Sequence, residues 1–218
     1  MELLAMFHQG GLVMYPLLLC SIIAVAILVE RLRTYKKAKS NMAMLREEIP
    51  AHIHEREALL DICVRDGGVA AEMVYAGAAQ GGGTPEQQNQ RMQSAAVTIA
   101  GRLRSYLNYL ETIVTLAPLL GLLGTVTGMI SSFNVLSVAD GQPFAITAGV
   151  GEALIATATG LCVAIIALVI HTYLVQVQDK LITDMEELGN VYMGALTGTT
   201  IMNDGEQVNE VAGDVSAA

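Results

Sequence analysis

Three long apolar runs constrain the fold of this chain more than any other feature. The first, Leu12 to Val29, carries no charge, the second runs from Thr112 to Ala139, and the third begins after Pro143 and continues to about Val175. A membrane-spanning helix needs about 20 apolar residues. Each run is therefore long enough to cross a bilayer, and the second is long enough that part of it must tilt or project.

Composition places the chain among membrane proteins. Of its 218 residues, 53% are hydrophobic and only 15% are charged, a balance that soluble domains of this size rarely show. The formal net charge is -9, and the basic residues form no patch beyond the short run from Arg31 to Lys39. We therefore expect no nucleic-acid partner. The three cysteines show neither metal-ligand spacing nor an even disulfide count.

The basic residues predict the orientation of the spans. Eleven of the twelve Lys and Arg residues lie between Arg31 and Arg104, the twelfth is Lys180, and the segment around Asp140 has none. By the positive-inside rule, residues 31–111 and the C-terminal region lie inside the cell, while the N-terminus and the Asp140 turn lie outside. Because residues 1–11 carry no Lys or Arg, we interpret the first run as an uncleaved anchor.

The expected organisation is a periplasmic N-terminal interfacial segment (1–11), a first membrane helix (12–30), a cytoplasmic helical region (31–111), a second membrane helix (112–138), a periplasmic turn (139–144), a third membrane helix (145–172), its cytoplasmic extension (173–202) and a disordered acidic tail (203–218).

Local signals refine the inner region. The sequence "TPEQ" at Thr84 to Gln87 combines an N-cap, a proline at the first helical position and a glutamine three residues after the cap. From there we expect one uninterrupted helix of about 50 residues that continues into the second span. Before Thr84, "MAMLREEIPAHIHEREALLDICV" and "AAEMVYAGAA" predict two shorter helices separated by Gly67 and Gly68.

A stripe of small and polar side chains runs along the second span. It consists of Pro118, Gly121, Thr125, Gly128 and Ser132, at spacings of three and four, and Gly124 with Gly128 makes a GxxxG pair. Such stripes let helix backbones approach closely in lipid. Close packing and a wet passage lined by hydroxyls are both compatible with this pattern.

Glu152 is the only formal charge in the third run. A charged side chain near the bilayer centre costs roughly 2.5–3.5 kcal/mol on insertion scales, so intramembrane carboxylates are candidates for function. Desolvation favours the neutral carboxyl, which makes a proton-carrying form available. The alternative is a structural glutamate bonded to hydroxyls of a neighbouring helix. On a helical wheel Thr159 shares the face of Glu152, whereas Thr157 points about 140° away.

The pairing of histidines with carboxylates in "HIHERE" (52–57) favours a solvated helix face over a metal site, because alternate residues of a helix face apart. No grouping of nucleophile, base and oxyanion donors is visible in the sequence, so we expect neither an enzyme active site nor a bound metal or other cofactor.

Three stretches resemble the MotA/TolQ/ExbB proton-channel family, and the three-span layout is similar to its ExbB/TolQ branch. They are "FHQGGLVMYPLLLCSIIAVAILVERL" from Phe7, "APLLGLLGTVTGMISSF" from Ala117 and "GVGEALIATATGLCVAI" from Gly149. The resemblance extends to about Leu196 and is most specific in the second and third stretches.

The resemblance implies an all-α, multi-pass protein of the bacterial inner membrane, three helices per chain, assembled as a homo-oligomer around a central pore. It implies a pentamer that surrounds the membrane helix of an ExbD-like or TolR-like single-span partner and drives TonB or TolA with the proton-motive force. The pore-facing polar positions of the family fall on Thr125, Glu152 and Thr157; the helical wheel adds Thr159. Gly121, Gly124, Gly128 and Ser132 are expected to pack helices together.

We expect the ExbB role in TonB-dependent outer-membrane transport, with protons as the transported ion. The TolQ role in envelope maintenance uses the same chemistry and differs in its partner. A membrane scaffold without an ion pathway is the alternative from a different functional class. A flagellar stator fits less well, because the MotA branch has four spans and this sequence shows three.

Overall fold

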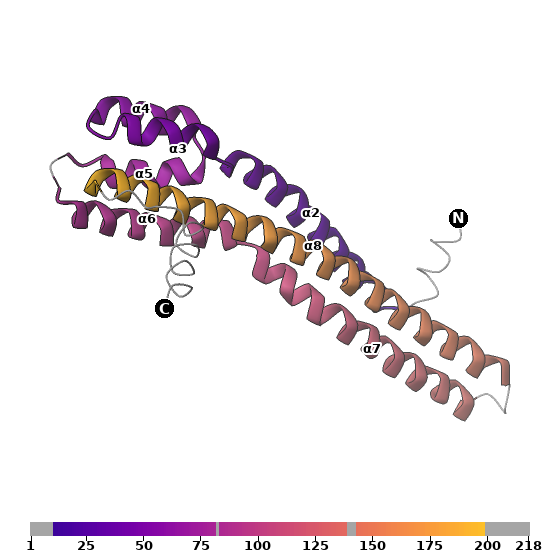
Figure 1. Ribbon diagram of the computed structural model, residues 1–218. Coiled ribbons are helices and arrows are strands. Elements are labelled where there is room, and N and C mark those ends of the chain that lie inside the picture. Colours follow the sequence, from indigo (N-terminus) through magenta and orange to yellow (C-terminus); the bar gives the residue numbers. More distant parts are fainter. Residues whose placement is uncertain (1–10, 82, 139–142, 199–218) are drawn as a thin grey trace, which may run out of the picture. The chain divides into compact units, whose positions relative to one another are not determined.

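The computed structural model describes residues 11–81, 83–138 and 143–198, with the side chains of 134–138 and 143–148 left aside. Helices account for all the regular structure in these ranges (Figure 1). They are α2 (Met14–Ala38), α3 (Met42–Ala51), α4 (Arg56–Asp66), α5 (Val69–Ala78), α6 (Pro85–Arg104), α7 (Leu107–Val138) and α8 (Pro143–Thr197). Among these residues, three helical segments are long and apolar enough to cross a membrane: Met14–Ala51 with α2, Pro85–Phe133 with most of α7, and Gly149–Thr197 within α8. The predicted all-α fold with three spans is confirmed.

Two compact units divide the chain. The span unit comprises Met1–Lys36 and Leu103–Gln178, and the loop unit comprises Lys37–Arg102 and Asp179–Ala218. Helix α8, 55 residues long, supplies residues to both units. Its first residue is proline, which is pre-organised for the first helical position, and no further proline interrupts it. It ends before Gly198, whose φ of 68° is the left-handed conformation common after helix ends.

The loop unit is built around buried aliphatic side chains from α3, α4 and α5 and from the last turns of α8. Leu45, Ile49, Leu59, Val74 and Leu188 are each at most 2% exposed. The amphipathic spacing of these residues along their helices explains why each helix buries one face. Arg46 forms an ion pair with Glu187 at the surface of this unit.

Two predicted boundaries of the loop unit are confirmed. Gly67 ends α4 in the left-handed conformation, with φ of 67°. At the start of α6, the Gln87 N–H donates to the Thr84 hydroxyl over 3.3 Å, and the Thr84 N–H donates to the Gln87 side-chain oxygen over 3.2 Å. This reciprocal pair is the capping box that "TPEQ" predicts.

The helix predicted from "MAMLREEIPAHIHEREALLDICV" is instead two helices, α3 and α4. Helix α3 ends at Ala51, immediately after Pro50, and Glu55 is the N-cap of α4. Proline has no N–H and its ring clashes with the preceding turn, so the chain leaves the helical path within a residue or two. The prediction underestimated this proline.

The expectation of one uninterrupted helix from Thr84 through the second span is also wrong. Helix α6 ends at Arg104 and α7 begins at Leu107, with Tyr106 at a φ of 68° between them. The Leu103 carbonyl accepts a hydrogen bond from the Tyr35 hydroxyl over 3.0 Å and one from Arg31 Nη1 over 3.4 Å. The Arg31 guanidinium also lies 4.9 Å from the centre of the Tyr106 ring. Partners from α2 therefore stabilise a break that no local residue signals.

The predicted N-terminal interfacial segment, the centre of the turn at 139–144 and the acidic tail lie outside the described residues, apart from Gly11 and the first residues of α8.

Candidate functional site

Small residues line the contact between α7 and α8. Gly121, Gly124, Gly128 and Ser132 on α7 are all buried. A Cβ atom built on Gly121 would lie 3.1 Å from Thr157 Cα, and one built on Gly128 would lie 3.0 Å from Ala153 Cβ. The backbones therefore approach within a distance that larger side chains would prevent, as small-residue stripes permit in membranes.

Helix α8 presents a matching small face to α7. A Cβ atom on Gly160 would lie 2.6 Å from the Ala117 carbonyl oxygen and 2.9 Å from Gly121 Cα. Ala153 and Ala156 are also buried on this side, at 3% and 1% exposure. Backbone rather than side chain opposes Gly160, so the clash that any larger residue would create there has no flexible group to relieve it.

The three candidate threonines bond differently. The Thr157 hydroxyl donates to the Gly121 carbonyl oxygen over 2.9 Å and so connects α8 to α7. The Thr159 hydroxyl donates to Ile155 within its own helix over 2.8 Å, and the Thr125 hydroxyl donates to Leu122 over 2.7 Å. All three residues are only half-buried. A threonine that bonds the preceding turn of its own helix still has lone pairs free to accept.

Glu152 lies on another side of α8, next to the beginning of α2. Its carboxylate packs on the backbone of Gly11, so that Oε1 occupies the space where a Cβ atom of residue 11 would be. The side chain is half-buried. Val13, just before α2, lies 3.7 Å from the position of a Cβ on Gly124 of α7. Further along, Met14 and Leu17 of α2 form an apolar cluster with Val13, Ala117 and Ala164. The beginning of α2 is thus packed against both α7 and α8.

The structure therefore separates the predicted site residues into two neighbourhoods. Thr157 faces α7, whereas Glu152 faces the start of α2, in agreement with the 140° between them on the helical wheel. Gly11 is a site residue that sequence reasoning missed. The glycine pair at residues 10 and 11, directly before an apolar run, is the signal that could have indicated a close backbone approach.

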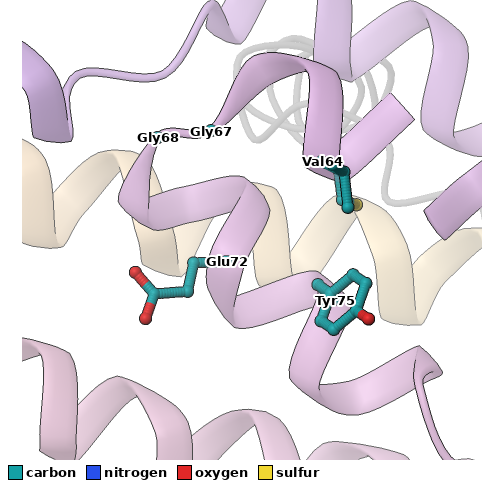
Figure 2. Close-up of a pocket in the computed structure, with 6 residues that line it drawn as sticks. Val64, Gly67, Gly68, Glu72 and Tyr75 are labelled. Atoms are coloured by element: carbon teal, nitrogen blue, oxygen red, sulfur yellow. The ribbon is translucent and has the colours of Figure 1, made fainter. Parts of the chain in front are cut away.

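The loop unit contains a separate hollow of about 260 Å³ between α4 and α5 (Figure 2). Val64 and Tyr75 lie at one end of it and Glu72 at the other. Cys63, also in its lining, is 2% exposed, and burial together with the nearby Asp66 carboxylate raises its pKa to about 11. A thiol that stays protonated at neutral pH is a poor nucleophile. Glu72 pairs with Arg102 at 2.5 Å, so the hollow offers no activated reactive group among its described residues.

Comparison with known proteins identifies the family. Residues 66–187 match the MotA/TolQ/ExbB proton channel family. ExbB-like protein 1 of Synechocystis sp., named for biopolymer transport, is 36% identical over 82% of this chain and 73% of its own length. The biopolymer transport protein exbB1 of Vibrio cholerae is 27% identical over 90% of both chains. The Tol-Pal system protein TolQ of Pseudomonas aeruginosa is 41% identical over 32% of this chain and 31% of its own length. The chain therefore belongs to the MotA/TolQ/ExbB proton channel family, in its ExbB branch.

Proposed function

We propose that this chain is the proton-channel and motor subunit of an inner-membrane complex that energises TonB-dependent outer-membrane transport. Membership of the ExbB branch supports a proton-channel subunit of the ExbB/TolQ type. The relatives named for biopolymer transport support the ExbB role among those open to the family. In this proposal the N-terminus is periplasmic and the loop unit is cytoplasmic, as the distribution of basic residues predicts.

The observation that carries the proposal is the placement of Glu152. It is a carboxylate within a membrane-spanning helix, half-buried at a junction of three helices whose neighbouring segments are uncharged: α2 carries no charge before Glu30, and α7 none after Glu111. No lysine or arginine lies between Arg104 and Lys180 to neutralise it. Binding and release of a proton is then the way to change its charge at this depth.

The energetic scale suits a motor. A proton that moves down a potential of 100 mV releases about 2.3 kcal/mol. That amount is comparable with the differences in packing energy between alternative helix arrangements. Protonation of Glu152 removes the charge that keeps the α2, α7 and α8 junction polar, so it can bias one arrangement over another.

The polar route is proposed to include Thr125, Thr157 and Thr159 together with Glu152. Thr159 lies on the wheel face of Glu152, and its hydroxyl oxygen can accept while its proton bonds Ile155. Thr157 bonds across to α7, so it would join a route that runs along the α7–α8 contact. Gly121, Gly124, Gly128 and Ser132 would hold the two helices close enough to define this route.

The assembly is proposed to be a homo-oligomer, a pentamer in the family pattern, around a single-span ExbD-like partner. Large apolar side chains project from the far side of α7, where Leu119, Leu122 and Ile130 are 56–60% exposed in the isolated chain. Lipid or neighbouring subunits would cover them. The partner's membrane aspartate would be the second proton carrier, and a TonB-like protein would receive the output.

Substitution of Glu152 tests the proposal. In cells whose own copy is replaced, we expect Glu152→Gln to abolish TonB-dependent uptake while the protein still inserts and assembles. Glu111→Gln, at an exposed carboxylate of α7, is the matched control and should retain uptake. Full uptake with Glu152→Gln would refute proton handling by this residue and favour the non-conducting scaffold.

The TolQ-like role in the Tol-Pal system is the second candidate, because the chain is also similar to TolQ of Pseudomonas aeruginosa over 71 residues. Co-purification of the native protein distinguishes the two. An ExbD-like and a TonB-like protein in the complex support the first role, and TolR-like and TolA-like proteins support the second. Recovery without any small single-span protein that bears a membrane aspartate would contradict both.

A further inference from the structure

The contact between Gly11 and Glu152 has a geometry that only glycine permits. The φ of Gly11 is +70°, in the left-handed region that side-chain-bearing residues rarely adopt. A Cβ atom built there would overlap Glu152 Oε1 and would lie 3.2 Å from its Cδ and 3.6 Å from its Cγ. Conformation and space therefore both restrict residue 11 to glycine, and the group that fills the space is the carboxylate itself.

Gly11 precedes α2, whose first residue is Met14, and the Gly11 carbonyl oxygen accepts a hydrogen bond from the Met14 N–H over 3.2 Å. The Tyr15 N–H likewise donates to the Leu12 carbonyl oxygen over 3.4 Å, so the first two N–H groups of α2 bond to residues just before the helix. From Gly11 to Val29 the sequence has no lysine, arginine or histidine. No cationic side chain of this segment therefore neutralises the Glu152 carboxylate where it meets Gly11.

We propose that Gly11 is a positioning residue for Glu152. Its missing side chain lets the carboxylate lie against the backbone that leads into α2. A side chain at residue 11 displaces the carboxylate from this place. The inference deepens the proposed proton function and rests on it, because it assigns the position from which Glu152 takes up and releases its proton.

A chemical readout on Glu152 itself tests the inference. A hydrophobic carbodiimide modifies protonated carboxyl groups in apolar surroundings, and mass spectrometry of the full-length protein in its native complex measures the yield at Glu152. We expect Gly11→Ala to change the initial labelling rate by about twofold or more, because the added methyl group moves the carboxylate into different surroundings. Gly67→Ala is the matched control: Gly67 has a φ of +67°, and the nearest atom to its Cβ position is Val64 O at 3.8 Å. It carries the same backbone strain without touching Glu152, so its labelling rate should equal that of the wild type.

Two further variants separate the steric effect of an added Cβ atom from the effect of backbone strain at residue 11. Asparagine tolerates the left-handed conformation but has a Cβ atom, so Gly11→Asn should label like Gly11→Ala if space decides, and it guards against misfolding of the alanine variant. Glu152→Asp shortens the acid by one methylene. Adding Gly11→Ala to Glu152→Asp should then change labelling at residue 152 by much less than Gly11→Ala does alone.

Wild-type labelling of Glu152 in both Gly11 variants would overturn the inference, as would an equal effect from Gly67→Ala. These results are independent of transport. If Gly11 has no influence on labelling but Glu152→Gln abolishes uptake, only the positioning role fails. If Glu152→Gln retains uptake, the proposed function fails whatever the labelling shows.

Discussion

Gly160 faces the backbone of α7 at a distance that leaves no space for a methyl group. The atoms opposite are the Ala117 carbonyl oxygen and Gly121 Cα, at 2.6 and 2.9 Å from the position of a Cβ. Gly160→Ala must therefore push the two helices apart, and overpacking of this kind costs about 1–3 kcal/mol. We expect a lower midpoint of thermal unfolding in detergent, followed by loss of the monodisperse chromatographic peak.

Gly151 offers the control on the same helix, because no atom lies within 4 Å of its Cβ position. Gly151→Ala replaces glycine by the best helix former, so its unfolding midpoint should equal or exceed that of the wild type. Equal midpoints for the two alanine variants would contradict the close approach of α7 and α8 at Gly160.

Cys63 predicts how the stability of the protein changes in alkaline solution. Its pKa is raised from 9.0 to about 11 in the folded chain, first by burial and then by Asp66. The unfolded thiol loses its proton near pH 9 while the folded thiol keeps it, so the contribution is complete below pH 9 and is lost as the pH rises towards 11. Between pH 8 and pH 10.5 the loss amounts to about 2 kcal/mol. Between pH 8 and pH 10.5, the midpoint of thermal unfolding should decrease more for the wild type than for Cys63→Ala. Equal decreases in the midpoint would exclude a buried neutral thiol.

At the scale of helices, the break between α6 and α7 depends on α2. Arg31 is 4% exposed, donates to the Leu103 carbonyl and lies over the Tyr106 ring. Arg31→Leu removes the hydrogen bond and the cation–π contact together, and contacts of these kinds contribute about 0.5–3 kcal/mol. Hydrogen–deuterium exchange of a peptide that covers residues 103–110 should therefore become faster in this variant.

Arg33 is the matched control for this experiment, because it lies one helical half-turn away on α2 and is exposed. Arg33→Leu also removes one positive charge from α2 but no contact with the break between α6 and α7. Hydrogen–deuterium exchange at residues 103–110 should therefore stay at the wild-type rate. Unchanged exchange in Arg31→Leu would mean that the break is stable without α2.

The same break shows where sequence reasoning stops. Gly67 and the Thr84–Gln87 capping box were predictable because glycine conformation and N-cap chemistry act within a few residues. No glycine or proline marks Tyr106; its left-handed conformation depends on Arg31 and Tyr35, about 70 residues earlier. Glu152 could likewise be recognised as unusual from the apolar run around it. Its contact with Gly11 could not be predicted, because contact between residues 141 positions apart in the sequence depends on how three helices pack.

At the scale of the whole molecule, the two compact units differ in their charged residues. The loop unit comprises 37–102 and 179 onward and holds Lys180 and most of the other basic residues, whereas Glu152 and the small-residue stripe belong to the span unit. Helix α8 contributes residues to both units, so the third span and part of the loop unit share one continuous helical backbone.

This division predicts which parts of the chain a membrane-impermeant maleimide can reach in intact cells. In a background with Cys20, Cys63 and Cys162 replaced by alanine, Gly101→Cys places a thiol on α6 where no atom lies within 4 Å of its Cβ position. Asp140→Cys places one in the segment without basic residues between the second and third runs. By the positive-inside rule, Asp140→Cys should react once the outer membrane is permeable, and Gly101→Cys only after the inner membrane is also opened. The reverse order would contradict the predicted topology, and it would place the start of α2 and the carboxylate of Glu152 nearer the cytoplasmic side.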